Sequence, residues 1–399
     1  MGDGLTPVNE MHVLAAVGMW GGWTTGYYLI VPFLFVLTIV VFFHELGHFL
    51  VARWCGVRVQ VFSIGFGREL FGFNDRHGTR WKLAAIPLGG YVKFLGDENA
   101  ASVPDRNVFA NMSESERRET FFHKSVAQRV AVVAAGPIAN FLLAIVIFAG
   151  VAMVYGKQET AARVDEVIPQ SAAAAAGFQP GDLVVSIDGA PIESFADMQR
   201  IVSTNAGRSL NFGIERNGSR ITLSAVPRLT EDKGAFGGTR QIGVLGIKRS
   251  LAPGDVKVRR VGPLAAIGLG LEETWSIVDG TFTYLGRWIT GHESSNQIGG
   301  PVGIALMSGE AARLGFDVLM RWAAAISVSI GLLNLFPIPL LDGGHLLFYG
   351  FEAVRGRPLS DRAQEVGFRI GFAIVVMLMI FATYNDIWRV IDLVHKLLS

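Results

Sequence analysis

Four long apolar segments constrain the fold of this chain more than any other feature. They run from about Tyr27 to Ala52, Val130 to Tyr155, Trp322 to Phe351 and Val366 to Val390. Each is long enough to cross a hydrocarbon layer of about 30 Å as a helix. The mean hydropathy is +0.39, and only 17% of the 399 residues are charged. We therefore expect a multi-pass α-helical membrane protein with four transmembrane helices.

The basic residues predict how these spans are oriented. Residues 53–129 carry twelve Lys and Arg, the loop 353–369 carries four, and the first 28 residues carry none. Cytoplasmic loops are enriched in Lys and Arg, so both basic loops are predicted to be cytoplasmic. Both termini and the section 156–321 are then outside. The N-terminus lacks the basic region of a cleaved signal peptide, so we expect the internal spans to direct insertion.

Two β-rich segments lie between the spans. Residues 57–127 alternate apolar and polar side chains around the turn-like stretch 74–78, which predicts a β-hairpin near the membrane surface or an ordinary small cytoplasmic sheet. Residues 157–229 contain GFQPGD at 177–182 and resemble a PDZ domain, with one short helix near Ala196–Ser203. A PDZ domain captures an extended peptide by strand addition, and a PDZ-shaped spacer without a ligand is the alternative.

An amphipathic helix is predicted over 264–289, because apolar side chains recur there every three or four residues. Its aromatic stripe suits a helix on the membrane surface, and a helix packed on the PDZ-like domain is the alternative. The net charge of +1 gives no reason to expect nucleic acid binding. The single cysteine, Cys55, excludes an internal disulfide and a Cys-rich metal site.

The motif HELGH occupies residues 44–48, inside the first apolar segment. On a helix, His44 and His48 share one face, so both imidazoles can reach one ion, and Glu45 can take a proton from bound water. Catalytic zinc has three protein ligands and keeps one position for water. Polar groups in hydrocarbon are costly unless they face one another, an ion or a water-filled cavity. This favours a metal site over a structural polar cluster without metal.

Asp342 is the strongest candidate for the third ligand. It is the only carboxylate in the interior of the other three segments, and it lies in NLFPIPLLDGG at 334–344. Pro337 and Pro339 remove amide donors and should break the helix just before Asp342. Irregular backbone at membrane depth is tolerated only where it is buried in protein or lines a cavity. The break is therefore expected to direct Asp342 towards the histidines.

HELGH and NLFPIPLLDGG together resemble the site-2 protease family, the M50-type intramembrane zinc metalloproteases. The PDZ-like insert between the second and third spans resembles the regulator-of-sigma-E protease branch of Gram-negative bacteria, although many members have two PDZ domains and this chain shows one. The resemblance implies a zinc endopeptidase in which His44, His48 and Asp342 bind Zn2+ and Glu45 is the general base. GPIAN at 136–140 also matches a family pattern.

Further roles follow from this resemblance. PLGGY at 87–91 is similar to the family's membrane-dipping β element, so Gly89, Gly90 and Tyr91 are expected to pair with an unwound substrate strand. Asn334 or Asn140 would donate to the oxyanion, with Asn334 preferred because it lies on the broken helix; equally, either would only cap broken backbone. His345 is expected to pack near the metal without binding it, since a fourth ligand would close the water position.

The implied partners are single-span membrane proteins and membrane lipid. The implied process is regulated intramembrane proteolysis, with an anti-sigma factor already cut by another protease as the typical substrate and signal-peptide remnants as another. The PDZ-like domain would bind peptide termini or gate substrate entry. The implied location is the bacterial inner membrane, with the active site towards the cytoplasm and the PDZ-like domain in the periplasm. A non-catalytic PDZ scaffold and a metal-ion transporter are the rival functions; the complete motif set argues against the scaffold, and no paired repeats of spans support the transporter.

The expected organisation has eight parts. They are an N-terminal segment with the first span (1–56), the hairpin region (57–127), the second span (128–156), the PDZ-like domain (157–229), a linker with the amphipathic helix (230–321), the third span (322–352), a cytoplasmic loop (353–365) and the fourth span (366–393).

Overall fold

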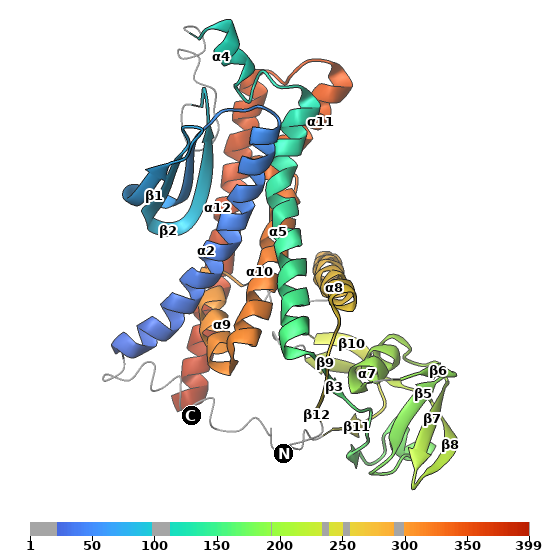
Figure 1. The fold of residues 1–399 in the computed structure, drawn as a ribbon. Coiled ribbons are helices and arrows are strands. Elements are labelled where there is room, and N and C mark those ends of the chain that lie inside the picture. Colours follow the sequence, from blue (N-terminus) through green and yellow to red (C-terminus); the bar gives the residue numbers. More distant parts are fainter. Residues whose placement is uncertain are drawn as a thin grey trace. The chain divides into compact units, whose positions relative to one another are not determined.

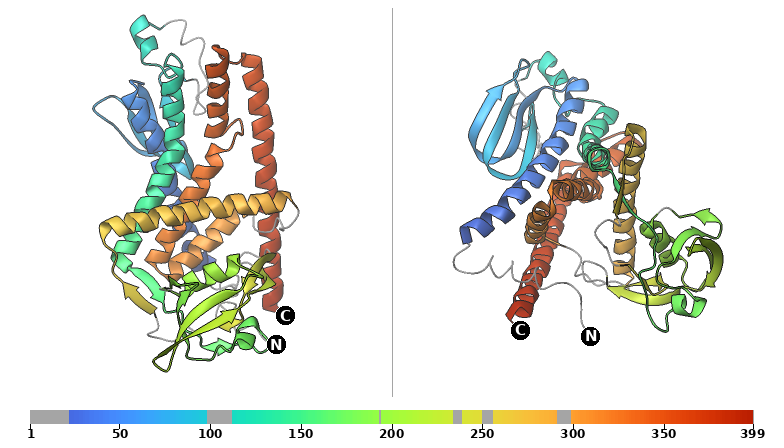
Figure 2. Two further views of the ribbon diagram at one scale, coloured as in Figure 1. Left: turned by 90° about the vertical axis from the view of Figure 1, so that its right-hand side faces the viewer. Right: turned by 60° about the horizontal axis from the view of Figure 1, so that its bottom comes forward.

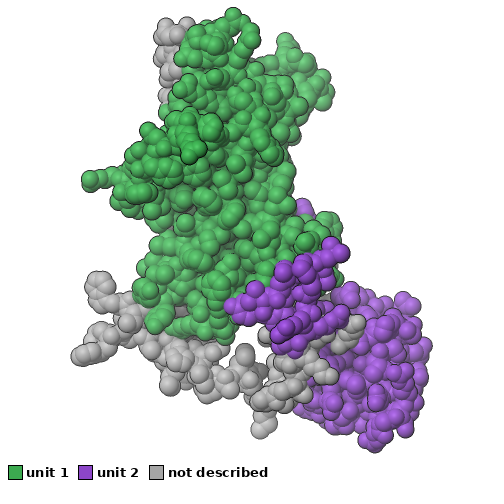
Figure 3. All heavy atoms as spheres, viewed as in Figure 1, with its two compact units in different colours: residues 1–151, 267–281, 298–399 green, residues 152–266, 282–297 purple. Residues whose placement is uncertain are grey.

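The computed structural model describes residues 22–97, 112–192, 194–233, 239–249, 256–290 and 299–398. The predicted outside position of the N-terminus concerns residues 1–21, which lie outside the described ranges, as do parts of the expected 57–127 and 230–321 regions. The chain divides into two compact units (Figure 3). Unit 1 comprises Met1–Val151, Ile267–Thr281 and Ile298–Ser399, and unit 2 comprises Ala152–Ala266 and Phe282–Gln297.

Four helices of unit 1 are long and apolar enough to cross a membrane, as the sequence predicted. The helices are α2 (Gly22–Trp54), α5 (Val126–Tyr155), α10 (Phe316–Leu335) and α12 (Asp361–Leu398). The third expected span, 322–352, is interrupted before Asp342 as its two prolines predicted, because α10 ends at Leu335 and a separate helix, α11 (Asp342–Arg355), follows. The break falls at Pro337 and Pro339, which lack the amide donors that a continuous helix needs.

Helices α2, α5 and α10 lie side by side in unit 1 (Figures 1 and 2). A Cβ atom on Gly47 of α2 would lie only 2.3 Å from the carbonyl oxygen of Ala135 on α5, so the two backbones approach closely because this residue is glycine. Helix α9 (Pro301–Leu314) packs against α2 and α10. The amides of Gly300 and Gly303, at the start of α9, donate to the buried carboxylate of Asp386 on α12.

The expected hairpin is present in unit 1. Strands β1 (Val59–Asn74) and β2 (Arg80–Phe94) pair antiparallel, and the short helix α4 (Glu114–Arg118) follows. The hairpin curls, because Phe62 of β1 pairs with both Val92 and Trp81 of β2. Its turn is tied to the end of α2, where Arg53 Nη1 lies 3.1 Å from Asp75 Oδ2.

Unit 2 is rich in β-structure. Strands β5 (Leu183–Ile187), β6 (Ala190–Pro191), β7 (Leu210–Arg216) and β8 (Ser219–Ala225) form a sheet in the order β6-β5-β7-β8. The helix expected near 196–203 is α7 (Phe195–Thr204), and α6 (Ala172–Ala176) is shorter. The other strands form two-stranded pairs: β3 (Lys157–Thr160) with β12 (Val256–Arg259), β4 (Glu166–Val167) with β11 (Ile247–Lys248), and β9 (Arg228–Lys233) with β10 (Thr239–Val244).

The predicted amphipathic helix is α8 (Pro263–Ile289). Its middle part, which belongs to unit 1, packs on the bundle: Ile277 and Val278 contact a core formed by α5 and α10. A Cβ atom on Gly270 would lie 2.6 Å from the carbonyl oxygen of Ile145, and α8 crosses α5 there (Figure 2). Neither predicted placement anticipated this contact, because periodicity identifies an apolar face but not the surface that covers it.

The loop that suggested a PDZ domain is held by a buried ion pair in unit 2. Asp182 is fully buried, and Arg216 of β7 donates to its two carboxylate oxygens at 2.7 Å. Burial alone would raise the pKa of the Asp182 carboxyl. The hydrogen bonds from Arg216 and from the amide of Gln179 outweigh this effect and hold that pKa below its ordinary value.

We expect Arg216→Leu to lower the free energy of unfolding of unit 2 by about 2–4 kcal/mol, because it leaves a buried carboxylate unpaired. Hydrogen exchange of the β5 and β7 amides in the full chain measures this loss. Folding lowers the pKa of Asp182, so the ion pair contributes its full stabilisation of unit 2 at pH values above the ordinary carboxyl pKa of about 3.9. This contribution is lost as the pH falls further and Asp182 becomes protonated. The exposed Arg220→Leu on β8 is the matched control. Equal exchange in both variants would contradict the role of the ion pair.

Candidate metal centre and catalytic cavity

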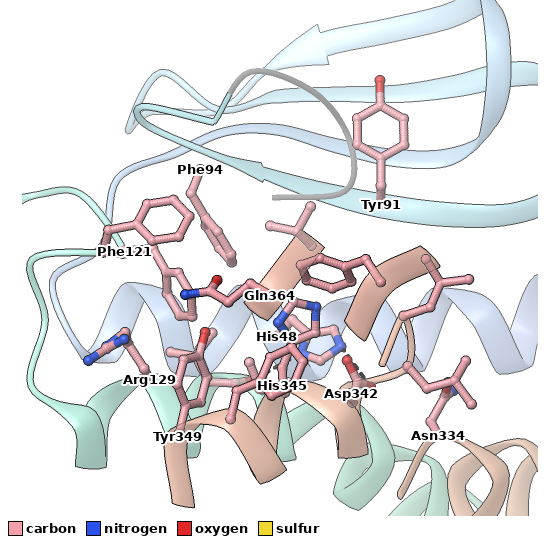
Figure 4. A pocket seen from close by; sticks show the side chains of 18 of the residues that line it. His48, Tyr91, Phe94, Phe121, Arg129, Asn334, Asp342, His345, Tyr349 and Gln364 are labelled. Carbon is pink, nitrogen blue, oxygen red and sulfur yellow. Dashed lines mark hydrogen bonds and ion pairs between the residues drawn. The ribbon is translucent and has the colours of Figure 1, made fainter. Parts of the chain in front are cut away.

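His44, His48 and Asp342 meet inside unit 1. The two imidazoles project from one face of α2, with their Nε2 atoms 3.3 Å apart. Asp342, the first residue of α11, places Oδ2 at 3.3 Å from His44 Nε2 and 3.5 Å from His48 Nε2. Figure 4 shows His48 and Asp342 directed towards one another. Among the described residues, this is the group whose ligand atoms lie close enough to share one metal ion.

The geometry of these three atoms fits zinc. Ligand atoms at about 2.0–2.2 Å from a tetrahedral zinc ion lie roughly 3.3–3.5 Å from one another. The three observed separations fall in that range. Asp342 Oδ2 is also buried and finds no hydrogen-bond partner among the described residues, as expected for an oxygen whose partner is an ion. Two imidazoles and a carboxylate would leave the fourth position open.

The chain between α10 and α11 directs Asp342 into the bundle. Leu340 has φ = 123°, an uncommon conformation for a bulky residue. A Cβ atom on Gly343 would lie 2.3 Å from the carbonyl oxygen of Phe336, and one on Gly344 would lie 2.5 Å from that of Ile338. The two glycines therefore let α11 start directly against the broken segment. Strained backbone conformations such as that of Leu340 are found most often at functional sites.

Helix α5 covers the far side of both imidazoles. The carbonyl oxygen of Val132 lies 2.8 Å from His48 Nδ1, and the side-chain amide of Asn140 lies 3.2 Å from His44 Nδ1. A Cβ atom on Gly136 would lie 2.3 Å from His48 Nε2 and 2.9 Å from His44 Cε1. The GPIAN segment thus contacts the two histidines directly. The sequence had suggested Asn140 as an oxyanion donor, and the structure places it behind His44.

Strand β2 passes over Glu45. A Cβ atom on Gly90 would lie 2.9 Å from Glu45 Cγ and 2.8 Å from the carbonyl oxygen of Ser63, so only glycine allows this approach. Gly89 has φ = 133° and lies against the ring of Phe66. Among the described strands, residues 90–92 pair with β1 on one side and have no strand on the other. A free strand edge therefore runs beside the HELGH motif.

Tyr91 differs from its glycine neighbours. Its ring stacks on Phe66 with centroids 6.0 Å apart, and the Lys82 ammonium lies 5.1 Å from its centroid. Figure 4 shows the ring directed away from Asp342. The backbone of this strand, rather than the Tyr91 side chain, faces the histidines.

One cavity of about 980 Å3 within unit 1 is lined by His44, Glu45, His48, Asp342, Gly90 and Tyr91. Asn334 lines it beside Asp342, and His345 lines it without joining the three ligand atoms (Figure 4). At another part of the cavity, Arg129 is paired with Glu352 at 2.6 Å, and its guanidinium lies 4.8 Å from the ring centroid of Tyr349.

Sequence reasoning missed these last residues. In the sequence, Arg129 was used only as one of the basic residues that predict the orientation of the spans, and Glu352 and Tyr349 lie in no motif. Their contacts join positions 223 residues apart, so no local spacing could have identified them.

Comparison with known proteins agrees with this geometry. The family model for peptidase family M50 matches residues 32–378. The chain is 51% identical over 360 residues to a Rhizobium meliloti protein named "Putative zinc metalloprotease", covering 90% of this chain and 96% of the relative. A protein of the same name from Agrobacterium fabrum is 50% identical over 366 residues, covering 92% and 97%. "Metalloprotease MmpA" of Caulobacter vibrioides is 43% identical over 383 residues, covering 90% and 96%.

The family match includes α2 from Pro32 onwards with its HELGH motif, the break before α11, and α12 as far as Leu378. The alignments with these relatives cover nearly the whole length of each relative, so the similarity is not confined to one domain. The chain therefore belongs to peptidase family M50, the site-2 protease family of multi-pass membrane metalloproteases, and is a hydrolase that acts on peptide bonds.

Proposed function

We propose that this chain is an intramembrane zinc endopeptidase whose zinc is held by His44, His48 and Asp342, with Glu45 as the general base. The observation that carries this proposal is the triangle of ligand atoms, 3.3–3.5 Å apart, among helices apolar enough to span a membrane. The names of the relatives support zinc as the metal.

Bound zinc supplies a Lewis acid and lowers the pKa of water. The protein provides the remaining functions. Glu45, next to the two histidines, accepts the proton of the attacking water at its carboxylate and delivers it to the leaving amine nitrogen. The apolar helices keep bulk water away from the reacting carbonyl.

Asn334 is our proposed donor to the oxyanion. It lines the cavity on the last turn of α10 and is only half-buried. Asn140 is fully buried, with its amide against His44. Asn334 is therefore better placed to meet a substrate, since an oxyanion donor must reach the reacting carbonyl.

The proposed substrates are transmembrane segments of single-span membrane proteins. A helix hides its carbonyls in hydrogen bonds, so a substrate must unwind before cleavage. The free edge at residues 90–92 lines the cavity that contains Glu45 and offers backbone groups to an extended chain. Gly89 and Gly90 keep this edge close to the motif, and pairing with it offsets the hydrogen bonds lost on unwinding.

The branch resemblance suggests the biological setting. We infer regulated intramembrane proteolysis of an anti-sigma factor after a first cut, and removal of signal-peptide remnants, in the bacterial inner membrane. The charge distribution supports an active site towards the cytoplasm and unit 2 in the periplasm. The exposed Leu70, Phe71 and Phe73 of the hairpin suit contact with lipid.

Unit 2 is proposed to contain a PDZ domain at residues 157–229. The GFQPGD loop, the four-stranded sheet and α7 support this assignment. Its proposed role is to bind peptide termini or to exclude substrates with bulky outer domains.

Glu45→Gln should reduce cleavage of a single-span substrate in membranes by about 10²- to 10⁴-fold, because the general base is lost. Zinc content should remain that of the wild type, since Glu45 is not among the three ligands. A zinc chelator should abolish wild-type cleavage. Cleavage that persists in Glu45→Gln would rule out the proposed base, and cleavage that persists in chelator would rule out the metal.

Three glycine-to-alanine variants separate metal binding from substrate binding. Gly136→Ala should displace the imidazole of His48 and weaken zinc binding by about 10- to 100-fold. Gly90→Ala should move the strand edge from Glu45 and reduce cleavage while zinc affinity is kept. Gly150→Ala on α5 should change neither, because its Cβ would meet nothing within 4 Å. Chelator competition and cleavage assays measure the two effects, and equal behaviour of Gly136→Ala and Gly150→Ala would contradict the proposed site.

Excision of residues 161–255 tests the role of unit 2. Thr160 and Val256 are paired neighbours on β3 and β12, so a short glycine linker can join them. We expect uncut substrates with bulky outer domains to be cleaved about as well as trimmed substrates. Unchanged preference for trimmed substrates would contradict a gating role.

A further inference from the structure

The GPIAN segment of α5 contains a buried polar side chain that the proposed mechanism does not use. Asn140 is fully buried, and its amide nitrogen, as drawn, lies 3.2 Å from His44 Nδ1. Its amide oxygen is buried with no hydrogen-bond partner. The amide can meet His44 Nδ1 with either its nitrogen or its oxygen, and only one of these two orientations is compatible with metal binding by His44.

His48 shows how one imidazole is fixed. Its Nδ1 lies 2.8 Å from the carbonyl oxygen of Val132, which can only accept a hydrogen bond. Nδ1 of His48 therefore carries the proton and donates it. The lone pair is left on Nε2, the atom that faces Asp342. A backbone carbonyl has thus selected the tautomer of His48 that can bind a metal.

His44 requires the same tautomer, but its partner is an amide with two different ends. If Asn140 Nδ2 donates to Nδ1, the proton must move to Nε2, where it blocks metal binding. If the amide is rotated by 180°, its oxygen accepts Nδ1–H and Nε2 keeps its lone pair. One end of the amide lacks a partner in either orientation, so the requirement of the histidine decides between them.

We propose that Asn140 is a positioning residue whose amide oxygen accepts the Nδ1–H of His44 and so holds His44 Nε2 as a metal donor. This inference rests on the proposed zinc site and assigns Asn140 a role other than contact with substrate. Both imidazoles are then oriented by α5, His48 through a backbone carbonyl and His44 through a side chain. Hydrogen bonds of this kind fix the ring orientation of metal-binding histidines and increase their basicity.

Helix α10 packs against α5 at Asn140. Ser327 of α10 is fully buried and donates through Oγ to the backbone carbonyl of Asn140 at 2.9 Å. A Cβ atom on Gly331, one turn further along α10, would lie 3.1 Å from Asn140 Cβ. Helix α10 therefore packs against the backbone of α5 at Asn140. The same helix leads to the break that delivers Asp342.

Two substitutions at Asn140 distinguish an acceptor from a donor. Asn140→Leu removes the polar group at similar volume. Asn140→Asp keeps an acceptor and removes the amide donor, because a carboxylate offers only acceptor oxygens. We expect Asn140→Leu to weaken zinc binding by about 10- to 100-fold and Asn140→Asp to keep wild-type affinity. Chelator competition on the purified full chain measures these affinities, and the absorption spectrum of the cobalt-loaded protein reports the ligand geometry.

Ser327→Ala is the matched control. It removes a buried hydrogen bond at the same helix contact but leaves the amide and His44 in place, so it should lower thermal stability without changing zinc affinity. Wild-type affinity in Asn140→Leu would overturn the inference. A loss in Asn140→Asp as large as in Asn140→Leu would also overturn it, by showing that the amide acts as a donor.

His44→Ala separates this inference from the proposed function. If His44→Ala binds zinc as tightly as the wild type, both the ligand assignment and the role of Asn140 fail. If His44→Ala loses zinc while Asn140→Leu does not, the proposed function stands and only the positioning role fails.

Discussion

Three polar side chains inside an apolar helix bundle set the main constraint on this structure. Two imidazoles and a carboxylate are costly in hydrocarbon unless each polar atom has a partner. The Nδ1 atoms of both histidines contact α5, and their Nε2 atoms converge with Asp342 Oδ2. An ion at the centre would satisfy the remaining atoms together. The helices must therefore approach closely, which is possible because Gly47 and Gly136 lack side chains.

The same constraint explains the irregular segment between α10 and α11. In a continuous helix the carbonyls and amides would be hydrogen-bonded within the helix, and the position of Asp342 would be fixed by helical spacing. Pro337 and Pro339 end the helix, and the glycines after Asp342 allow the next one to start against it. The irregular backbone lines the cavity at Leu340 and Leu341, where such backbone is tolerated within a membrane. Local strain and the proposed metal ligand Asp342 thus occupy the same short stretch.

The hairpin adds the component that the proposed cleavage of transmembrane helices needs. Its free edge at residues 90–92 and the carboxylate of Glu45 border one cavity. Gly90 lets the strand reach α2, and the bond between Arg53 and Asp75 ties the turn of the hairpin to the end of the same helix. The surface proposed to receive an extended substrate is therefore attached to the helix that carries the proposed base. Tyr91, although adjacent, is held by Phe66 and Lys82 instead.

The sequence by itself determined the four spans, the hairpin, the helix at 263–289, the break before Asp342 and the family, because each depends on local hydropathy, periodicity or a contiguous motif. Only the tertiary structure decided what surrounds the histidines. It placed the side-chain amide of Asn140 against His44, packed the middle of α8 on α5, and paired Arg129 with Glu352. These contacts join residues far apart in the chain. Side-chain patterns show that a residue is polar or apolar, but the packing of helices determines which partner it meets.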